Sequence, residues 1–306
     1  MKSGFLQQIK DWPGRFGYVT IVGRPNVGKS TLLNRIIGQK LSIISRKPQT
    51  TRSRILGIKT ADNCQTVYID TPGLQKKPGS MFNRYMNREA LSSLADVDVI
   101  VHMVEAVTWT EPDEYVHQLV KQAHAPVLLA INKVDRIKNK KVILPFIKMI
   151  HEKNGYQDII PISAHANINV DRLEECIGSR LPPGTALFPE DQITDRSERY
   201  FAAEFLREKL FQRLGDELPY NLCVTIEEFS DTPVLIKIDA VIWVEKSGQK
   251  KIVIGSDGAV LKKTGEQARH DMEKLFGKKV LLRTWVRVKK NWTNDVQALK
   301  QLGYSR

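Results

Sequence analysis

The chain has 306 residues, of which 42% are hydrophobic and 26% charged, and its formal net charge at pH 7 is +13. This composition is typical of a soluble globular protein long enough for two domains. No apolar run approaches the roughly 18 residues of a membrane span, and residues 1–6 lack a signal peptide's apolar core. Cys64, Cys176 and Cys223 lie far apart with no metal-binding spacing, so we expect a reducing cytosol without disulfides or a cysteine metal site.

The first predicted elements enclose a phosphate-binding loop. Residues 18–22 form an apolar run that predicts a strand, and residues 31–37 have a helical pattern. The segment between them has the form G-x-x-x-x-G-K-S, in which two glycines let the backbone wrap around an anion. Lys29 supplies a charge to the outer phosphates and Ser30 can ligate Mg²⁺. We therefore predict a nucleoside triphosphate site formed by Gly23, Arg24, Pro25, Asn26, Val27, Gly28, Lys29, Ser30 and Thr31.

A second strand, at residues 67–70, ends in a carboxylate. Asp70 is placed to hold Mg²⁺ through water, and it is followed by Thr71, Pro72 and Gly73, whose last N–H can meet the γ-phosphate. Leu74 comes next, at the position where Ras-like enzymes have a glutamine that orients the attacking water. Leucine can neither donate nor accept a hydrogen bond. We therefore expect slow intrinsic hydrolysis, with catalytic help from a partner, an ordered water or a monovalent cation.

The choice of base is predicted by two further strand ends. Residues 126–131 are an apolar run followed by Asn132, Lys133, Val134 and Asp135, and an ionised Asp135 can accept from both N1–H and the exocyclic amine of guanine. Adenine lacks that donor pair. Residues 158–162 predict a further strand, after which backbone groups of Ser163, Ala164 and His165 could surround the base. Ligands of open α/β sheets bind at the carboxyl ends of strands, so these motifs predict a doubly wound α/β domain that binds GTP.

These motifs resemble a known family. Residues 19 to about 180 resemble a translation-factor-class GTPase domain, and residues 23–31, with Thr50, Thr51 and Arg52, resemble the Era family of GTPases in particular. The resemblance implies that Thr51, with Thr50 as the nearby alternative, completes the Mg²⁺ shell when the γ-phosphate is present and orders the loop from about residue 40 to 54. It implies Lys29, Thr51 and Gly73 as catalytic residues. Ser30, Thr51 and, through water, Asp70 would hold Mg²⁺, and Asn26 is a candidate to help hold K⁺.

A domain boundary is predicted by Pro182, Pro183, Gly184 and Pro189, which cannot continue the preceding helix. We predict a GTPase domain over residues 15–183, a linker over 184–194 and a second domain over 195–306. Asp195, with Glu198 three residues later, predicts the start of a helix whose apolar stripe runs to Gly215. The runs at residues 222–228 and 234–244 then predict sheet.

The second domain contains a G-x-x-G loop at residues 255–258. We predict the order strand, loop, helix and strand around it, with the helix reaching Lys274 and the last strand at residues 279–288. Residues 246–290 have 13 basic and 4 acidic side chains, which is typical of a phosphate-backbone footprint. This half resembles a type II KH domain, as in the Era family, whose loop clamps single-stranded RNA. The tetrapeptide alone could also be a plain turn.

One residue of this loop departs from the KH pattern. Asp257 places a negative charge beside the expected phosphates, which shifts weight to the lysines around the loop and to two arginines of the last strand. The predicted RNA-binding residues are Lys250, Lys251, Ile254, Gly255, Ser256, Gly258, Lys262, Lys263, Arg283 and Arg287.

Together the two halves predict a GTP-hydrolysing, RNA-binding switch. The resemblance implies Mg²⁺ and GTP or GDP as cofactors, and single-stranded ribosomal RNA near the 3′ end of the small-subunit RNA, during subunit assembly, as the partner. We expect a monomer in a bacterial cytoplasm, with peripheral association at the inner membrane left open and no DNA partner. Two alternatives stay open: a nucleotide-gated RNA-binding checkpoint with negligible turnover, and a GTPase of RNA modification or of the membrane surface.

Overall fold

The computed structural model describes residues 14–45, 47, 50–76, 78–156, 158–215 and 218–304. Contacts between Cα atoms divide the chain into two compact units. The described residues within 1–42, 51–78 and 86–195 form unit 1, and those within 43–50, 79–85 and 196–306 form unit 2. Among the described residues, no helix combines the length and apolarity that a membrane crossing requires.

Unit 1 is built on a six-stranded sheet with the order β2-β3-β1-β4-β5-β6. Only β2 is antiparallel to its neighbour, and the remaining pairs are parallel. The central strands are apolar on both faces, as expected for a parallel sheet covered on both sides. The strands are β1 (Arg15–Val22), β2 (Ile55–Ala61), β3 (Cys64–Asp70), β4 (Val99–Glu105), β5 (Val127–Asn132) and β6 (Asp158–Pro161).

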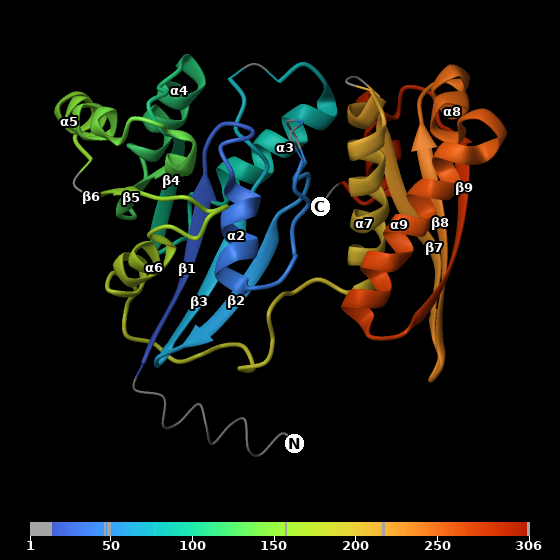
Figure 1. Cartoon of the computed structure of the whole chain (residues 1–306), viewed down its shortest axis with the longest axis horizontal. Helices are drawn as coiled ribbons and strands as arrows, with labels where there is room; N and C mark the ends of the chain where they lie inside the picture. The colour runs from blue at the N-terminus through green and yellow to red at the C-terminus, as the bar shows by residue number, and fades with distance from the viewer. Residues whose placement is uncertain are drawn as a thin grey trace. The chain divides into compact units, whose positions relative to one another are not determined.

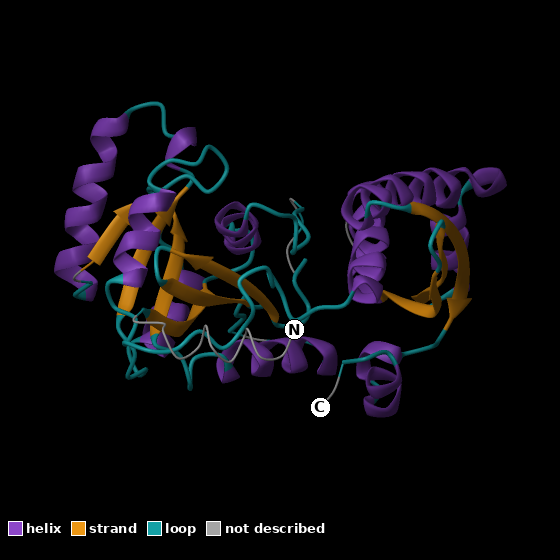
Figure 2. Cartoon of the chain, turned by 90° about the horizontal axis from the view of Figure 1, so that it is seen from below, coloured by secondary structure: helices purple, strands orange, loops and turns teal. Residues whose placement is uncertain are grey.

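Helices lie on both faces of this sheet (Figures 1 and 2). One core cluster joins Val22 and Ile100 of the sheet to Ala90 and Val116 of two helices, and another joins Leu129 to Phe146 and Ile150. The predicted doubly wound α/β fold is therefore confirmed for this unit. Its helices are α2 (Lys29–Ile37), α4 (Glu111–Val120), α5 (Ile143–Asn154) and α6 (Val170–Gly178), with the short turns η1 (Val134–Arg136) and η2 (Lys140–Val142); α3 (Met81–Ser92) has its first residues in unit 2.

Unit 2 is a three-stranded sheet of order β7-β8-β9 with helices on one face (Figures 1 and 2). The first two strands are antiparallel and the last two are parallel. Phe205, Leu206, Ile238 and Ala268 are buried between helices and sheet. The elements are α7 (Glu198–Arg213), η3 (Leu218–Asn221), β7 (Leu222–Asp231), β8 (Leu235–Val244), α8 (Ser247–Ile254), η4 (Ser256–Gly258), α9 (Ala259–Phe276), β9 (Lys279–Val288), η5 (Trp292–Asn294) and α10 (Val296–Gln301).

The start of α7 differs from the prediction. Ser197, not Asp195, is the N-cap, and its side chain accepts from the backbone N–H of Tyr200. The Asp195 carboxylate instead accepts from the backbone N–H of Leu56 at 3.3 Å. The prediction was wrong because both residue types suit an N-cap, and the sequence does not show that Asp195 has a distant partner.

Unit 2 also includes two segments that are distant in the sequence. The ring of Phe82 lies 5.5 Å from Trp292 and 4.8 Å from Tyr304 in edge contacts. Arg207 is 1% exposed, pairs with Glu204 and donates to the backbone oxygen of Thr50 at 2.6 Å. Phe82 and Thr50 are therefore packed within this unit.

Candidate nucleotide and RNA sites

The phosphate loop lies between β1 and the N-terminus of α2. Lys29 is 6% exposed, and its Nζ donates to the backbone oxygens of Gly23 and Arg24, both at 3.1 Å. Burial lowers the pKa of Lys29 to about 8. Gly28 has φ 111°, and a Cβ there would lie 2.3 Å from the amide nitrogen of Asn132, so only glycine fits. The loop therefore surrounds the Lys29 ammonium group with backbone groups, where it can bind an anion.

Arg24 is fixed by carboxylates that the sequence analysis did not select. Its Nε donates to both oxygens of Asp113 at 3.1 Å, and a terminal nitrogen lies 3.4 Å from Glu105. Glu105 also accepts from Lys133 of the base-reading motif at 2.8 Å. One carboxylate at the end of β4 thus joins the phosphate loop to the base-reading segment, and Arg24 is engaged within the protein.

Three hydroxyl groups converge on Asp70. Ser30 and Ser42 each donate to its Oδ2 at 2.9 Å, and Thr51 donates to it at 3.2 Å. Thr51 also lies 2.8 Å from Ser30, so its hydroxyl lies beside the two other predicted metal residues. The other oxygen, Oδ1, is buried without a partner among the described residues, and burial raises the pKa of Asp70. An orphaned carboxylate oxygen beside two hydroxyls suits Mg²⁺, which prefers oxygen ligands and retains several waters.

Ser42 is a further member of this cluster that the sequence did not indicate. Asn34 of α2 holds its backbone, since Oδ1 accepts from the N–H groups of Leu41 and Ser42 at 2.9 Å and Nδ2 donates to the Ser42 oxygen at 2.8 Å. Asn34 lies one helical turn beyond Ser30, which is the only sequence signal for this clamp.

The residues after Asp70 continue toward the phosphate loop. Thr71 is fully buried and donates to the Ile21 oxygen, and a Cβ on Gly73 would lie 2.8 Å from the backbone nitrogen of Pro25. Gly73 is therefore required for the close approach of the two loops. Leu74 is 1% exposed and packs in the core with Ala90 and Val116, so its role is packing.

The base-reading motif is organised by side chains that support one another. Asn132 donates to the Val27 oxygen at 2.7 Å and accepts from the Ala164 N–H at 3.0 Å, so it ties the motif to the phosphate loop. Asp135 is exposed, and Ser163 donates to its Oδ1 at 2.6 Å. That hydrogen bond lowers the pKa of Asp135, which keeps the carboxylate ionised and oriented for a donor pair.

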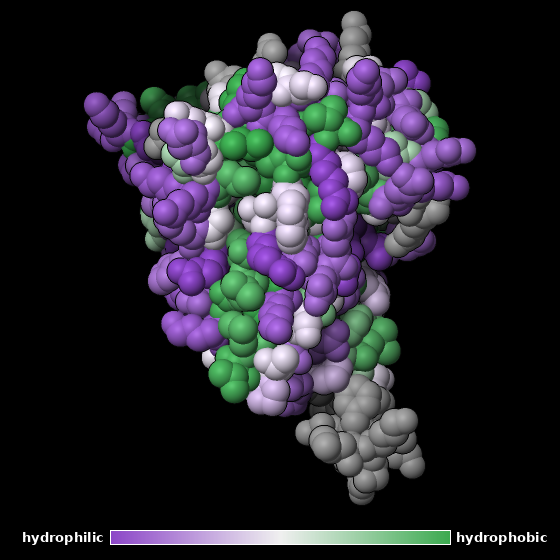
Figure 3. All heavy atoms as spheres, turned by 90° about the vertical axis from the view of Figure 1, so that its right-hand side faces the viewer, coloured by the Kyte–Doolittle hydropathy of each residue, from purple (hydrophilic) through white to green (hydrophobic). Residues whose placement is uncertain are grey.

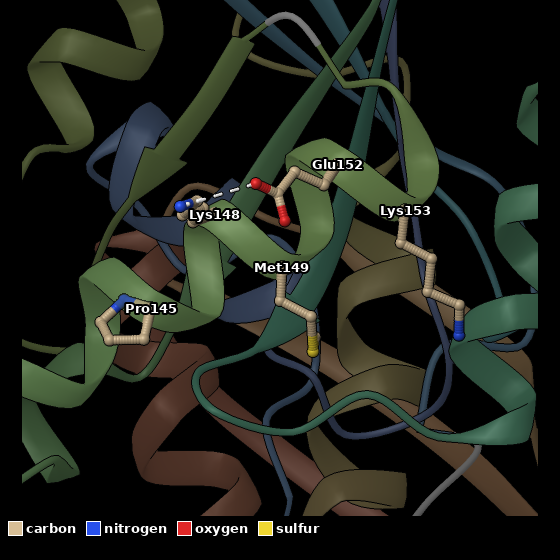
Figure 4. A pocket seen from close by; sticks show the side chains of 5 residues that line it. All are labelled: Pro145, Lys148, Met149, Glu152 and Lys153. Carbon is tan, nitrogen blue, oxygen red and sulfur yellow. Dashed lines mark ion pairs between the residues drawn. The ribbon is translucent and has the colours of Figure 1, made fainter.

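The candidate K⁺ residue lies in the phosphate loop. Asn26 is exposed in the loop at φ 65°, a left-handed conformation that asparagine tolerates. Within the part of the chain that the structure describes, no group of three or more His, Cys, Asp or Glu side chains could hold a metal. The hollow of Figure 4 is lined only by α5 residues, from Pro145 to Lys153, and contains none of the motif residues.

The G-x-x-G loop joins α8 to α9, which corrects the predicted order. Residues 250–254 lie in a helix and not in a strand, although Ile252, Val253 and Ile254 are β-branched. The backbone N–H of Lys250 donates to the Lys246 oxygen at 3.1 Å and that of Gly255 to the Lys251 oxygen at 2.8 Å, so helical hydrogen bonds form here in spite of the β-propensity. The loop therefore lies between two helix ends, with exposed lysines on both sides: Lys250, Lys251, Lys262 and Lys263.

Asp257 has a conformational reason to be in the loop. Its φ is 48° and its ψ 27°, in the left-handed region that Asp and Asn enter more readily than other non-glycine residues. Ser256 donates to its carboxylate at 3.3 Å. The acidic side chain is thus compatible with the backbone even though its charge opposes a phosphate.

Arg283 and Arg287 of β9 are paired, in contrast to the lysines. Arg283 donates twice to Asp239, at 2.7 and 2.8 Å, and Arg287 donates to Glu227 at 2.6 Å. Their charges are therefore largely compensated, so their predicted role as direct phosphate ligands has less support than that of the lysines.

The face shown in Figure 3 bears a band of hydrophobic side chains flanked by hydrophilic ones.

Comparison with known proteins gives consistent matches along the chain. A family model described as a 50S ribosome-binding GTPase matches residues 18–133, and a KH-domain model matches residues 217–293. GTPase Era of Ectopseudomonas mendocina is 52% identical over 290 residues, which cover 95% of this chain and 97% of that one. A crystal structure of Era with MgGDPNP and nucleotides 1506–1542 of 16S ribosomal RNA has a TM-score of 0.93 and 40% identity, covering 96% of this chain and all of that one. A variant of Aquifex aeolicus Era bound to GDP·AlF4⁻ has a TM-score of 0.92 and 40% identity, covering 95% of this chain and all of that one.

Proposed function

This chain belongs to the GTPase Era family, and on that premise we propose that it binds and hydrolyses GTP and binds the 3′ end of small-subunit ribosomal RNA during subunit assembly. The observation that carries the nucleotide half is the placement of Lys29, Asp70 and Asp135 at or just beyond the carboxyl ends of β1, β3 and β5 of one sheet. The RNA half is supported by the helix-loop-helix with exposed lysines and by the relative's complex.

The catalytic role of the site residues is to position the nucleotide and to compensate the charge of its phosphates. Lys29 and the N–H groups at the start of α2 would hold the outer phosphates, while Asp135 and Asn132 fix the base at the other end. When bound, Mg²⁺ would neutralise charge on the phosphate oxygens, held by Ser30 and Thr51 and through water by Asp70. Gly73 would offer its N–H to the γ-phosphate. The buried Leu74 cannot orient water, so we expect slow hydrolysis by the chain alone.

The experiment that tests this function measures single-turnover hydrolysis of GTP and ATP, with and without a 37-nucleotide RNA that matches the 3′-terminal segment seen with the relative, positions 1506 to 1542. We expect hydrolysis of GTP alone, with a faster rate when RNA is bound. GTP binding without turnover in either condition would instead support the checkpoint alternative. Hydrolysis of ATP at the same rate would contradict the role of Asp135.

We extend the proposal to K⁺ as an activating ion held beside the phosphates by Asn26. The test compares turnover in K⁺ and Na⁺ at matched ionic strength, using Asn26→Gly, because alanine at φ 65° would add strain to the loop. K⁺ should accelerate the wild type but not the variant, with GDP affinity preserved within about tenfold. Equal wild-type rates in the two salts would exclude the cation and leave RNA or an ordered water.

We place the protein in the cytoplasm as a monomer that binds RNA and not DNA, with peripheral attachment to the inner membrane through its basic surface. Retention on vesicles with anionic lipids, compared with retention on RNA, tests the attachment. Vesicle binding that RNA does not compete with would favour a membrane role over the ribosomal one.

A further inference from the structure

The outer face of the unit 2 sheet has features that the RNA loop does not explain. Along β9, Val280 and Val286 are buried on the helix side, whereas the alternate residues Leu281 and Trp285 are 44% and 41% exposed. Aromatic side chains of this size bury a large apolar area when they are covered, so an exposed tryptophan on a sheet is a candidate contact surface.

The parallel register builds this face from pairs across β8 and β9. Asp239 lies opposite Arg283, Val241 opposite Trp285, and Trp243 opposite Arg287. The Arg283 guanidinium lies 5.8 Å from the ring of Trp285, and Arg287 lies 5.8 Å from that of Trp243. Because carboxylates hold both guanidinium groups, the face presents planar groups in fixed positions.

Charge indicates a polyanion as the occupant. Residues 278–290 contain six basic side chains and no acidic ones: Lys278, Lys279, Arg283, Arg287, Lys289 and Lys290. Asp231, Glu273, Asp239 and Glu227 compensate four of them, and the ammonium of Lys289 lies 6.0 Å from the ring of Trp243. Unpaired bases stack on aromatic rings and guanidinium planes while nearby cations attract the backbone, which is how sheet surfaces bind single-stranded RNA.

The size of the RNA gives a second, independent reason. A KH loop clamps about four nucleotides. The segment in the relative's complex spans positions 1506 to 1542, which is 37 nucleotides. That RNA is longer than the loop alone can hold, which leaves nucleotides free to contact a second surface.

We propose that the outer face of the β7-β8-β9 sheet is a second RNA contact, on which an unpaired base stacks against Trp285 beside the fixed guanidinium of Arg283. This inference rests on the proposed RNA-binding function and adds a surface separate from the loop between α8 and α9. Arg283 acts here through its plane, which agrees with its ion pair to Asp239.

The test compares two RNAs, the 37-nucleotide segment and a single-stranded piece of about eight nucleotides, long enough for the loop alone. Trp285→Ala should weaken binding of the long RNA by about tenfold, since one stacked base is lost, and binding of the short RNA by less than about twofold. Trp285→Phe keeps an aromatic ring and should retain most of the affinity. Leu281→Ala, on the same face, is the matched control for lost apolar area.

The outcomes separate this inference from the function beneath it. Lys262→Gln with Lys263→Gln should weaken both RNAs, and a wild type that binds neither RNA would refute the proposed function itself. If the wild type binds both and Trp285→Ala binds the long RNA normally, the stacking surface is refuted and Trp285 serves to cover Val241 or to bind a protein. Unchanged GDP affinity and circular dichroism show that the variants are folded. If Trp285→Ala is unfolded, the RNA affinities of Trp285→Phe and Trp285→Leu are compared instead, because only the first keeps an aromatic ring.

Discussion

The nucleotide site of unit 1 and the RNA-binding surface of unit 2 are organised in different ways. In unit 1, Lys29, Asp70 and Asn132 are nearly buried, and each has protein partners at hydrogen-bond distance. In unit 2, Lys262 and Lys263 are exposed, and no described carboxylate pairs with them. A buried network is preorganised before its ligand arrives, whereas exposed cations act through long-range charge. Substitutions should therefore be costly and interdependent in unit 1, and mild, additive and salt-dependent in unit 2.

The largest effect is expected at the base. Asp135→Asn replaces one of the two acceptor oxygens by a donor NH2 group and should weaken GDP binding by about 3 kcal/mol, because one guanine donor then faces another donor. The variant should gain affinity for xanthosine diphosphate. Calorimetric titration with GDP and with xanthosine diphosphate measures both affinities. Ser163→Ala removes only the hydroxyl that orients Asp135, and it should weaken GDP binding by about 1 kcal/mol. Equal losses in the two variants would contradict direct reading of the base by Asp135.

Ser42→Ala tests whether the hydroxyl cluster orients Asp70. Loss of this hydrogen bond should raise about tenfold the Mg²⁺ concentration that half-saturates GTP binding, as removal of a residue supporting a metal ligand does. Ser45→Ala removes a hydroxyl from the same segment and should leave the Mg²⁺ requirement unchanged. An unaltered requirement in Ser42→Ala would mean that the cluster contributes to folding alone.

The pair Lys262→Gln and Lys263→Gln tests whether substitutions in unit 2 are additive and salt-dependent. The two changes should lower RNA affinity about fivefold at 0.15 M salt and reduce the slope of log affinity against log salt by about 1.4. Their effects should add, and GDP affinity should not change. Strong non-additivity between the two lysines would break the contrast with unit 1.

The pH dependence of nucleotide binding follows from Lys29. Its pKa of about 8 without ligand means that it loses its proton as the pH rises through 8, while a bound phosphate favours the charged form. Binding must then take up a proton, so GDP affinity should fall about threefold between pH 7.5 and 8.5. Guanosine, which has the same base without phosphates, is the control. An equal decline for guanosine would assign the effect to another group.

The smallest effect is expected at Asp257. Asp257→Asn removes the charge while keeping a residue that tolerates φ 48°, and it should tighten RNA binding about twofold through lower repulsion. Asp257→Lys combines a favourable charge with backbone strain and is the less informative change. Filter binding at low salt measures both. Weaker binding of the asparagine variant would show that the carboxylate itself contacts the RNA.

The sequence predicts the nucleotide site well because its chemistry is confined to short motifs at strand ends. Fixed spacing within a motif places Lys29 and Ser30, and the order of strands places Asp70 and Asp135 at the same sheet edge. The supports for these residues are not local in the sequence. Asp113 contacts Arg24 across 89 positions, and no pattern around either residue indicates the pair.

In unit 2 the same limit affects the elements themselves. Residues 250–254 are helical in the folded unit although their local propensity favours a strand. The carboxylate partners of Arg283 and Arg287 likewise come from neighbouring strands, so the sequence indicates the basic charge but not its compensation.

The edges of the two sheets differ in how they are protected against association with other chains. In unit 1 the edge strand β2 is covered, because Ile58 donates to the Ile193 oxygen at 2.9 Å and Gly57 bridges Thr194. In unit 2 the strand β9 pairs with β8 on one side and has no strand on the other within the described sheet. Exposed strand edges template aggregation unless charge, especially lysine, prevents pairing. Lys278, Lys279, Lys289 and Lys290 place lysines at both ends of β9, which is the kind of charge that disfavours pairing of this open edge with another strand.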